Sequence, residues 1–95
     1  MKIVVINNKN KLEVVETDNI VEYIEKTVGT NYFHKNFHDM YVIEDACFDG
    51  ERHSFDNVVF YGNIVFVNYD PFENTYFSIT REQLNELRRI ERNTF

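Results

Sequence analysis

Apolar and polar positions follow different periods in different parts of the chain, and these periods predict its secondary structure. Residues 2–6 are a β-branched apolar run, a polar turn follows, and residues 12–16 resume strand-like composition, so a hairpin is predicted. Ile20, Ile24 and Val28 then recur every four residues, which predicts a helix of about ten residues. The polar residues before this helix and the glycine after it suit a helix start and a helix end.

The middle of the chain has mainly strand-like patterns. Residues 30–39 contain aromatics without a sustained period, so a loop, a short strand and a single helical turn all stay open. Residues 40–48 have the pattern of a strand, Asp49-Gly50 is a tight-turn dipeptide, and residues 51–55 are the expected return strand of a hairpin. Two further strands are predicted over residues 58–61 and 63–69, separated by Gly62 at a bulge or bend.

A turn and a second helix close the chain. The turn is predicted over residues 70–74, where proline, aspartate and asparagine gather, and residues 75–79 can return as a strand. Thr80 and Gln83 have the spacing of a capping box, in which each side chain bonds the backbone of the other residue. A helix is therefore predicted from about residue 81 to 92, which buries Leu84, Leu87 and either Ile90 or the stem of Arg88.

These segments give the order β-β-α-β-β-β-β-α and predict the fold class α+β. The expected architecture is one mostly antiparallel, twisted sheet of about five to six strands with two helices packed on it. A chain of 95 residues provides one hydrophobic core, so residues 1–95 are expected to form a single domain. A hydrophobic content of 43%, with 16% aromatic, excludes intrinsic disorder as the default state.

Cysteine usage, apolar runs and charge narrow the classes of function. The lone Cys47 cannot form an internal disulfide, and the first residues do not resemble a signal peptide, so a cytoplasmic location is expected. The apolar runs of four residues are far shorter than the roughly 20 residues that span a bilayer, so no membrane association is expected. The net charge of −6 disfavours direct binding to nucleic acid.

Blocks along most of the chain resemble one protein family. The opening MKIVVINNKNKLEVVETDNIVEYIEKTVG, the block MYVIEDACFDGE and the closing GNIVFVNYD and FSITREQL are similar to segments of a family of small domains encoded by phages and conjugative elements. The shared motifs are structural: a turn, a bend glycine and a capping box. Asn7-Asn8 stands where a Pro-Gly type turn is usual, and TNYFHKNFHD replaces the usual segment after the helix. The resemblance implies a mobile-element origin and a bacterial host cell, with no established activity and no functional residues to carry over.

The histidines and the cysteine are the candidates for metal or nucleophile chemistry. His34 and His38 have the spacing of two ligands on one helix face, with Asp39, Cys47 or His53 available as further Zn²⁺ ligands. Their segment lacks a helical pattern, and no Cys-x-x-Cys accompanies them, so no metal or other cofactor is expected. Cys47 lies in a predicted strand beside acidic residues, which favours a structural core thiol over an activated nucleophile.

Carboxylates make up the densest polar group of the sequence. A first patch surrounds the predicted central hairpin and a second lies in the turn near residue 70; together they comprise Glu44, Asp45, Asp49, Glu51, Asp56, Asp70 and Glu73. The spacing does not match an EF-hand loop, and adjacent residues of a strand point to opposite faces, so neither a metal site nor acid–base catalysis is expected. The patch is then either a solvated hairpin that protects a sheet edge or a negative surface offered to a basic groove.

Aromatic residues gather between residues 57 and 77. Sheets that stack nucleic-acid bases interleave their aromatics with Lys and Arg, and this segment holds neither, so core packing is the preferred interpretation. A small-ligand pocket lined by Tyr61, Tyr69 and Tyr76 is an alternative.

Together these features predict a non-enzymatic accessory protein of a phage or mobile element that binds a host protein stoichiometrically. Its acidic residues are expected to occupy the basic nucleic-acid-binding groove of a host defence nuclease, such as a CRISPR effector or a restriction enzyme, and thereby to inhibit it. The alternative is a small-molecule or nucleotide-binding accessory domain that uses the aromatic-rich sheet face. A homodimer also stays open.

Overall fold

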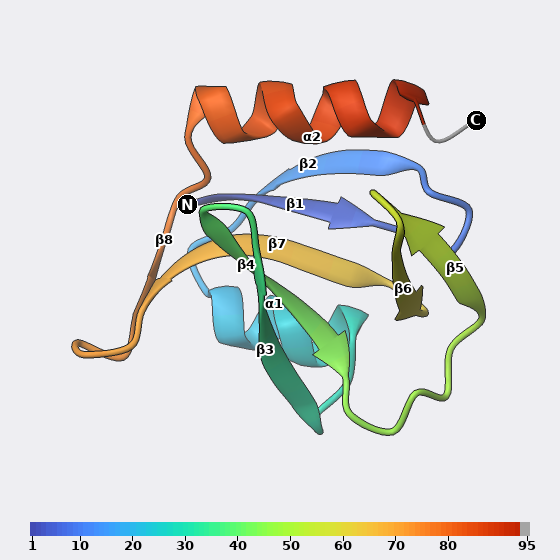
Figure 1. The fold of residues 1–95 in the computed structure, drawn as a ribbon. Helices are drawn as coiled ribbons and strands as arrows, with labels where there is room; N and C mark the ends of the chain where they lie inside the picture. The colour runs from blue at the N-terminus through green and yellow to red at the C-terminus, as the bar shows by residue number, and fades with distance from the viewer. Residues whose placement is uncertain (94–95) are drawn as a thin grey trace.

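The computed structural model describes residues 1–93, which form eight strands and two helices (Figure 1). The strands are β1 (Lys2–Ile6), β2 (Leu12–Glu16), β3 (Tyr32–Phe37), β4 (Met40–Asp45), β5 (Arg52–Phe55), β6 (Val58–Tyr61), β7 (Ile64–Asp70) and β8 (Thr75–Phe77). The helices are α1 (Ile20–Thr27) and α2 (Arg81–Asn93). Residues 30–39, for which the sequence allowed a loop, a short strand or a helical turn, contain strand β3.

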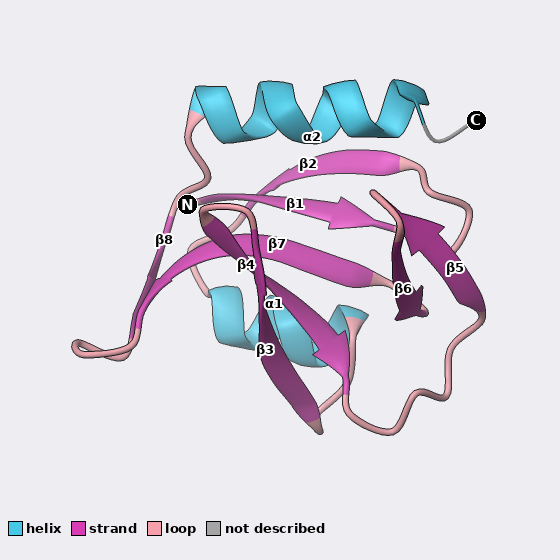
Figure 2. Ribbon diagram, in the orientation of Figure 1, coloured by secondary structure: helices cyan, strands magenta, loops and turns pink. Residues whose placement is uncertain are grey.

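The main sheet has the strand order β2-β1-β7-β4-β3, and β8 pairs with the end of β7 (Figure 2). Each of these pairings is antiparallel. Strands β5 and β6 form a separate antiparallel pair. The expected α+β class, with a mostly antiparallel sheet and two helices, is therefore confirmed.

The two helices cover opposite faces of the main sheet. Val4, Val42 and Phe66 pack with the apolar side of α2, whereas their strand neighbours Ile3, Ile43 and Val65 pack with α1. Successive residues of a strand point to opposite faces, so β1, β4 and β7 contribute to both cores. These central strands are consequently buried on both sides, and their near-continuous apolar sequences follow from that position.

Both helices begin as their sequences predict. The side chain of Asn19 accepts a hydrogen bond from the backbone N–H of Glu22 at 3.1 Å, which makes it the N-cap of α1. At α2, Thr80 Oγ1 accepts from the Gln83 N–H at 3.1 Å while Gln83 Oε1 accepts from the Thr80 N–H at 2.9 Å. This reciprocal pair confirms the capping box.

The predicted hairpin around Asp49-Gly50 is wrong. Strand β4 ends at Asp45 and pairs with β3 and β7, while β5 pairs with β6. The tight turn of that second pair is Asp56-Asn57, with φ of 54° and 62°, which are the two positive angles of a type I′ turn. Gly50 allows a close contact between two backbone segments. A Cβ at position 50 would lie 2.3 Å from the Cα of Gly62, so only a residue without a side chain fits there.

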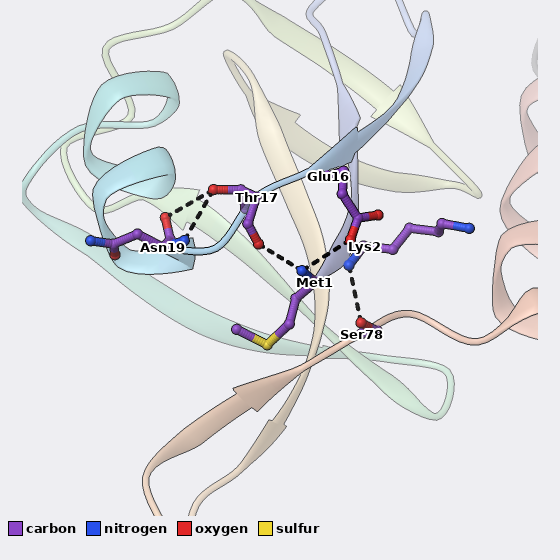
Figure 3. A network of polar contacts seen from close by, with 6 residues as sticks. All are labelled: Met1, Lys2, Glu16, Thr17, Asn19 and Ser78. Atoms are coloured by element: carbon purple, nitrogen blue, oxygen red, sulfur yellow. Dashed lines mark hydrogen bonds and ion pairs between the residues drawn. The ribbon is translucent and has the colours of Figure 1, made fainter.

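The first residues of the chain are hydrogen-bonded to the end of β2 and to the segment between β8 and α2 (Figure 3). The N-terminal ammonium group donates to the Thr17 carbonyl at 2.7 Å and lies 3.1 Å from a carboxylate oxygen of Glu16. The backbone N–H of Lys2 donates to Ser78 Oγ at 3.0 Å, and the N–H of Ile79 donates to the Lys2 carbonyl at 2.8 Å. These bonds fix the backbone of Lys2 beside the segment that leads into α2.

Candidate functional site

The predicted acidic residues lie in separate parts of the fold. Asp45 ends β4, and Asp49 and Glu51 lie in the connection to β5; we call residues 45–51 the acidic loop. Asp56 lies at the β5–β6 turn, where its carboxylate is 2.8 Å from His38 Nε2. Figure 1 shows the turn between β7 and β8, which carries Asp70 and Glu73, at the opposite end of the molecule from the acidic loop.

Glu44 is not an exposed member of this set. Its side chain is buried at 1% exposure, and its Oε2 accepts the backbone N–H of Tyr61 at 2.8 Å. On β4 it points to the face on which β6 lies, so it ties the small β5–β6 sheet to the main sheet. The expectation that Glu44 belongs to a solvated acidic surface is therefore wrong, because its carboxylate is enclosed by the protein.

The acidic loop is held in shape by its own backbone contacts. Asp45 Oδ1 accepts the N–H of Cys47 at 3.0 Å, and the Asp45 carbonyl accepts the N–H of Phe48 at 3.3 Å. Further along, Glu51 Oε2 accepts from Asn8 Nδ2 at 2.8 Å. Asp45 and Glu51 also line one open cavity of about 390 Å³, so the loop presents carboxylates around a hollow.

Phe48 anchors the loop and is itself half-exposed. Its ring meets those of Phe33 and Tyr61 edge to face, at centroid distances of 6.0 and 5.3 Å. Half of its surface stays open to solvent. Cys47 beside it is an exposed free thiol, so the expected core position of this cysteine is wrong; it lies in a loop because β4 ends two residues earlier.

Four tyrosines surround His34 on the face of the sheet beside α1, and we call Tyr32, His34, Tyr41, Tyr69 and Tyr76 the tyrosine cluster. The imidazole stacks on the rings of Tyr69 and Tyr76 at centroid distances of 4.6 and 5.7 Å, and meets Tyr41 edge-on at 6.1 Å. Strand β4 separates β3 from β7, so His34 must lean across Tyr41 to reach Tyr69.

The pKa values of His34 and Tyr76 in this cluster are both shifted in the direction that favours the neutral form. Nε2 of His34 lies 2.7 Å from the hydroxyl of Tyr76. The surrounding rings partly desolvate the imidazole, which lowers the pKa of His34. Burial, followed by the influence of Tyr32 and Tyr69, raises the pKa of Tyr76. The cluster therefore offers aromatic faces and hydroxyl groups.

The sequence had suggested a pocket lined by Tyr61, Tyr69 and Tyr76. Tyr69 and Tyr76 do meet, at a centroid distance of 4.9 Å, but Tyr61 lies on β6 and packs against Phe48 of the acidic loop. The other members were missed because they come from β3 and β4, and neither the pairing of β3 with β4 nor that of β4 with β7 has a local sequence signal.

The tyrosine cluster and the acidic loop adjoin each other at Asp45. Asp45 is directly opposite Tyr32 in the antiparallel ladder of β3 and β4. Directly opposite residues share a face, with Cβ atoms about 4.5–5.5 Å apart. A single surface therefore carries tyrosine rings at one end and carboxylates at the other.

The three histidines do not come together as metal ligands. His34 lies in the tyrosine cluster, His38 contacts Asp56, and the ring of His53 lies 2.7 Å from both the Asn10 side-chain oxygen and the Gly62 carbonyl. Within residues 1–93, no group of three or more His, Cys, Asp or Glu side chains could hold a metal ion. No helix within the same range is long and apolar enough to cross a membrane.

Comparisons with known proteins add no relative. No family model matches the chain, and neither a curated protein nor a solved structure matches it.

Proposed function

We propose that the protein acts without catalysis, by stoichiometric binding of its acidic loop and tyrosine cluster to a basic surface of a partner protein. The observation that carries this proposal is the position of Asp45, which belongs to the loop and lies opposite Tyr32 of the cluster. Carboxylates and aromatic faces side by side are the two groups that recognise a guanidinium, by paired hydrogen bonds and by stacking.

The shape and charge of this surface support a basic partner. Asp49 and Glu51 are exposed, Phe48 is half-exposed, and no Lys or Arg lies within residues 45–51. The whole chain carries a net charge of −6, which steers it toward positive surfaces. Phe48 supplies the apolar anchor that the centre of a protein interface usually contains.

The partner we propose is a host defence nuclease, of the CRISPR-effector or restriction type, in a bacterium that carries the phage or mobile element. Such enzymes hold nucleic acid in basic grooves, and clustered carboxylates can occupy the positions of phosphates there. The resemblance to phage and conjugative-element domains and the acidic loop together support this choice of partner.

Charge reversal in the loop tests the proposal. The triple variant Asp45→Lys, Asp49→Lys, Glu51→Lys changes the net charge from −6 to 0, since each reversal adds two charges to the total of −6. We expect its affinity for an arginine-rich peptide, measured by calorimetry, to fall at least about tenfold, or about 1.4 kcal/mol. The triple variant should also fail to capture the host proteins that the wild type captures from a lysate, as identified by mass spectrometry.

The matched control reverses three exposed acids elsewhere, Glu13, Asp18 and Glu25, and also reaches a net charge of 0. This control should keep the affinity, because it preserves the loop. Equal losses in both variants, or no loss in the loop variant, would refute a specific acidic contact. Thermal melts of both variants check that each one is folded.

The tyrosine cluster by itself favours a second candidate, a binding site for a small planar ligand such as a nucleotide. Stacked rings with hydroxyl groups, and without cations, would bind through apolar contact and hydrogen bonds. The salt dependence of binding separates the two functions: affinity for a basic partner falls steeply as salt rises, whereas stacking on the cluster does not.

A further inference from the structure

The hairpin that joins β7 and β8 presents a phenylalanine to solvent. Phe72 is 97% exposed, although it follows the only proline of the chain in an ordered turn. Asp70 Oδ1 accepts the backbone N–H groups of Phe72 and Glu73 at 3.0 and 3.3 Å, and the Tyr69 hydroxyl bonds the side chain of Asn74. The ring is thus held outward by a preformed turn, a state that costs little entropy on binding.

A groove of matching character lies where α2 begins. It has a volume of about 540 Å³, within the range of about 300–1,000 Å³ that is usual for binding sites. Its apolar lining comes from Val14, Ile79 and Leu84. Its cationic lining comes from Lys2, Arg81 and Arg88.

The charges of the hairpin and of the groove are complementary and unpaired. Within residues 1–93, the ion pairs involve neither the hairpin acids Asp70 and Glu73 nor the three cations of the groove. An apolar ring flanked by carboxylates therefore faces solvent on one surface, and a groove lined by both cationic and apolar residues faces solvent on another. Complementary potentials of this kind select a partner and fix its orientation.

We propose that the protein forms a two-fold symmetric homodimer in which Phe72 of each copy inserts into the α2 groove of the other. Figure 1 shows that the β7–β8 hairpin and the start of α2 lie at the same end of the molecule, so one two-fold axis near that end can make both contacts. In a closed dimer each contact occurs twice, which doubles its contribution. The inference goes beyond the proposed function and uses no residue of the acidic loop.

Sedimentation equilibrium of the full chain tests the dimer. We expect the wild type to dimerise, and Phe72→Ser to be monomeric at the same concentrations with an unchanged melting temperature, because the ring makes no intramolecular packing to lose. Val21→Ser removes another exposed apolar side chain, on α1, and should leave the dimer intact. A wild type that stays monomeric up to about 1 mM would overturn the proposal.

A charge exchange tests the groove itself. Arg88→Glu should weaken the dimer at least about tenfold, and adding Glu73→Arg in the same chain should restore most of the affinity, since the opposed charges are then exchanged. A dimer that tolerates Phe72→Ser with unchanged Kd refutes the insertion. The dimer could also depend on Phe72 while its Kd is unchanged by Arg88→Glu and by the double variant with Glu73→Arg. This result would place the ring outside the α2 groove and would also overturn the proposal.

Discussion

His34 is an exposed residue whose imidazole is nevertheless partly desolvated by neighbouring aromatic rings. Its imidazole stacks on two tyrosine rings and its Nε2 lies 2.7 Å from the Tyr76 hydroxyl. Partial desolvation lowers its pKa in the folded state, whereas the unfolded chain keeps the ordinary value. Folding therefore opposes the uptake of a proton at this position.

This opposition makes stability depend on pH. As the pH falls from about 7.5 to about 5.5, it passes through the ordinary histidine pKa of about 6.5, and the unfolded state takes up the proton first. Proton uptake lowers the free energy of the unfolded state relative to the folded state. The wild type should therefore lose stability over this interval relative to His34→Phe, which keeps an aromatic ring and cannot titrate. Urea unfolding of both proteins at the two pH values measures the difference. An equal change in both would show that His34 contributes nothing to the pH dependence.

At the scale of the element, α2 is the segment best defined by its own sequence. Besides the capping box, Gln83 exchanges two hydrogen bonds with Asn68 of β7, at 2.7 and 2.9 Å. The same side chain therefore caps the helix and joins it to the central strand. The start of α2 is fixed both along the chain and across the fold.

Thr80→Ala should destabilise the protein by about 1 kcal/mol, because the Gln83 N–H loses its acceptor. Thr80→Ser keeps the oxygen and should cost only a few tenths of a kcal/mol. Denaturant unfolding of the two variants gives both values. Equal costs for alanine and serine would show that the methyl group of Thr80, and not the cap, stabilises the helix start.

The elements that were predicted correctly depend on neighbours in the sequence, and those that were missed depend on distant partners. A cap is complete within four residues, so Thr80 and Gln83 could be recognised from their spacing alone. Over residues 30–39 the sequence could not separate a strand from a loop or a helical turn, because both faces of β3 carry aromatics: Tyr32 joins the tyrosine cluster, while Phe37 packs in the core under α2. The alternation of this strand is therefore masked.

The same reasoning explains the candidate site. Asp45, Asp49 and Glu51 were found because they are close in sequence, whereas the tyrosine cluster forms only once β4 pairs with β7. Glu44 was misplaced for the same reason, because its burial comes from Tyr61 on β6. The sequence shows where charged residues lie along the chain, but the pairing of the strands determines which of them are exposed to solvent.

For the molecule as a whole, the two cores share one set of central strands. Ile24 of α1 and Leu87 of α2 are fully buried on opposite faces of the sheet. Strands β1, β4 and β7 contribute side chains to both cores. If one core unfolds, these strands are disrupted and the other core is exposed to solvent. Unfolding should therefore be a single cooperative transition.

Cavity variants on the two faces test this coupling. Ile24→Ala and Leu87→Ala should each cost about 2–5 kcal/mol, and the double variant should show about the sum, because the two sites share no contacts. Each variant should unfold with coincident transitions by circular dichroism and by tyrosine fluorescence, the chain having six tyrosines and no tryptophan. Separate transitions for the two probes would show that the faces unfold independently.

The contact between Gly50 and Gly62 constrains how this sequence can diverge. A side chain at position 50 would collide with the backbone of Gly62, and a Cβ on Gly62, where φ is +72°, would lie 3.2 Å from the Gly50 Cα. Surface carboxylates can be gained or lost one at a time at small cost to stability, whereas neither glycine can be replaced without moving the other segment. Two glycines twelve positions apart, the second ending an aromatic strand, are therefore a more durable mark of common descent than the acidic residues.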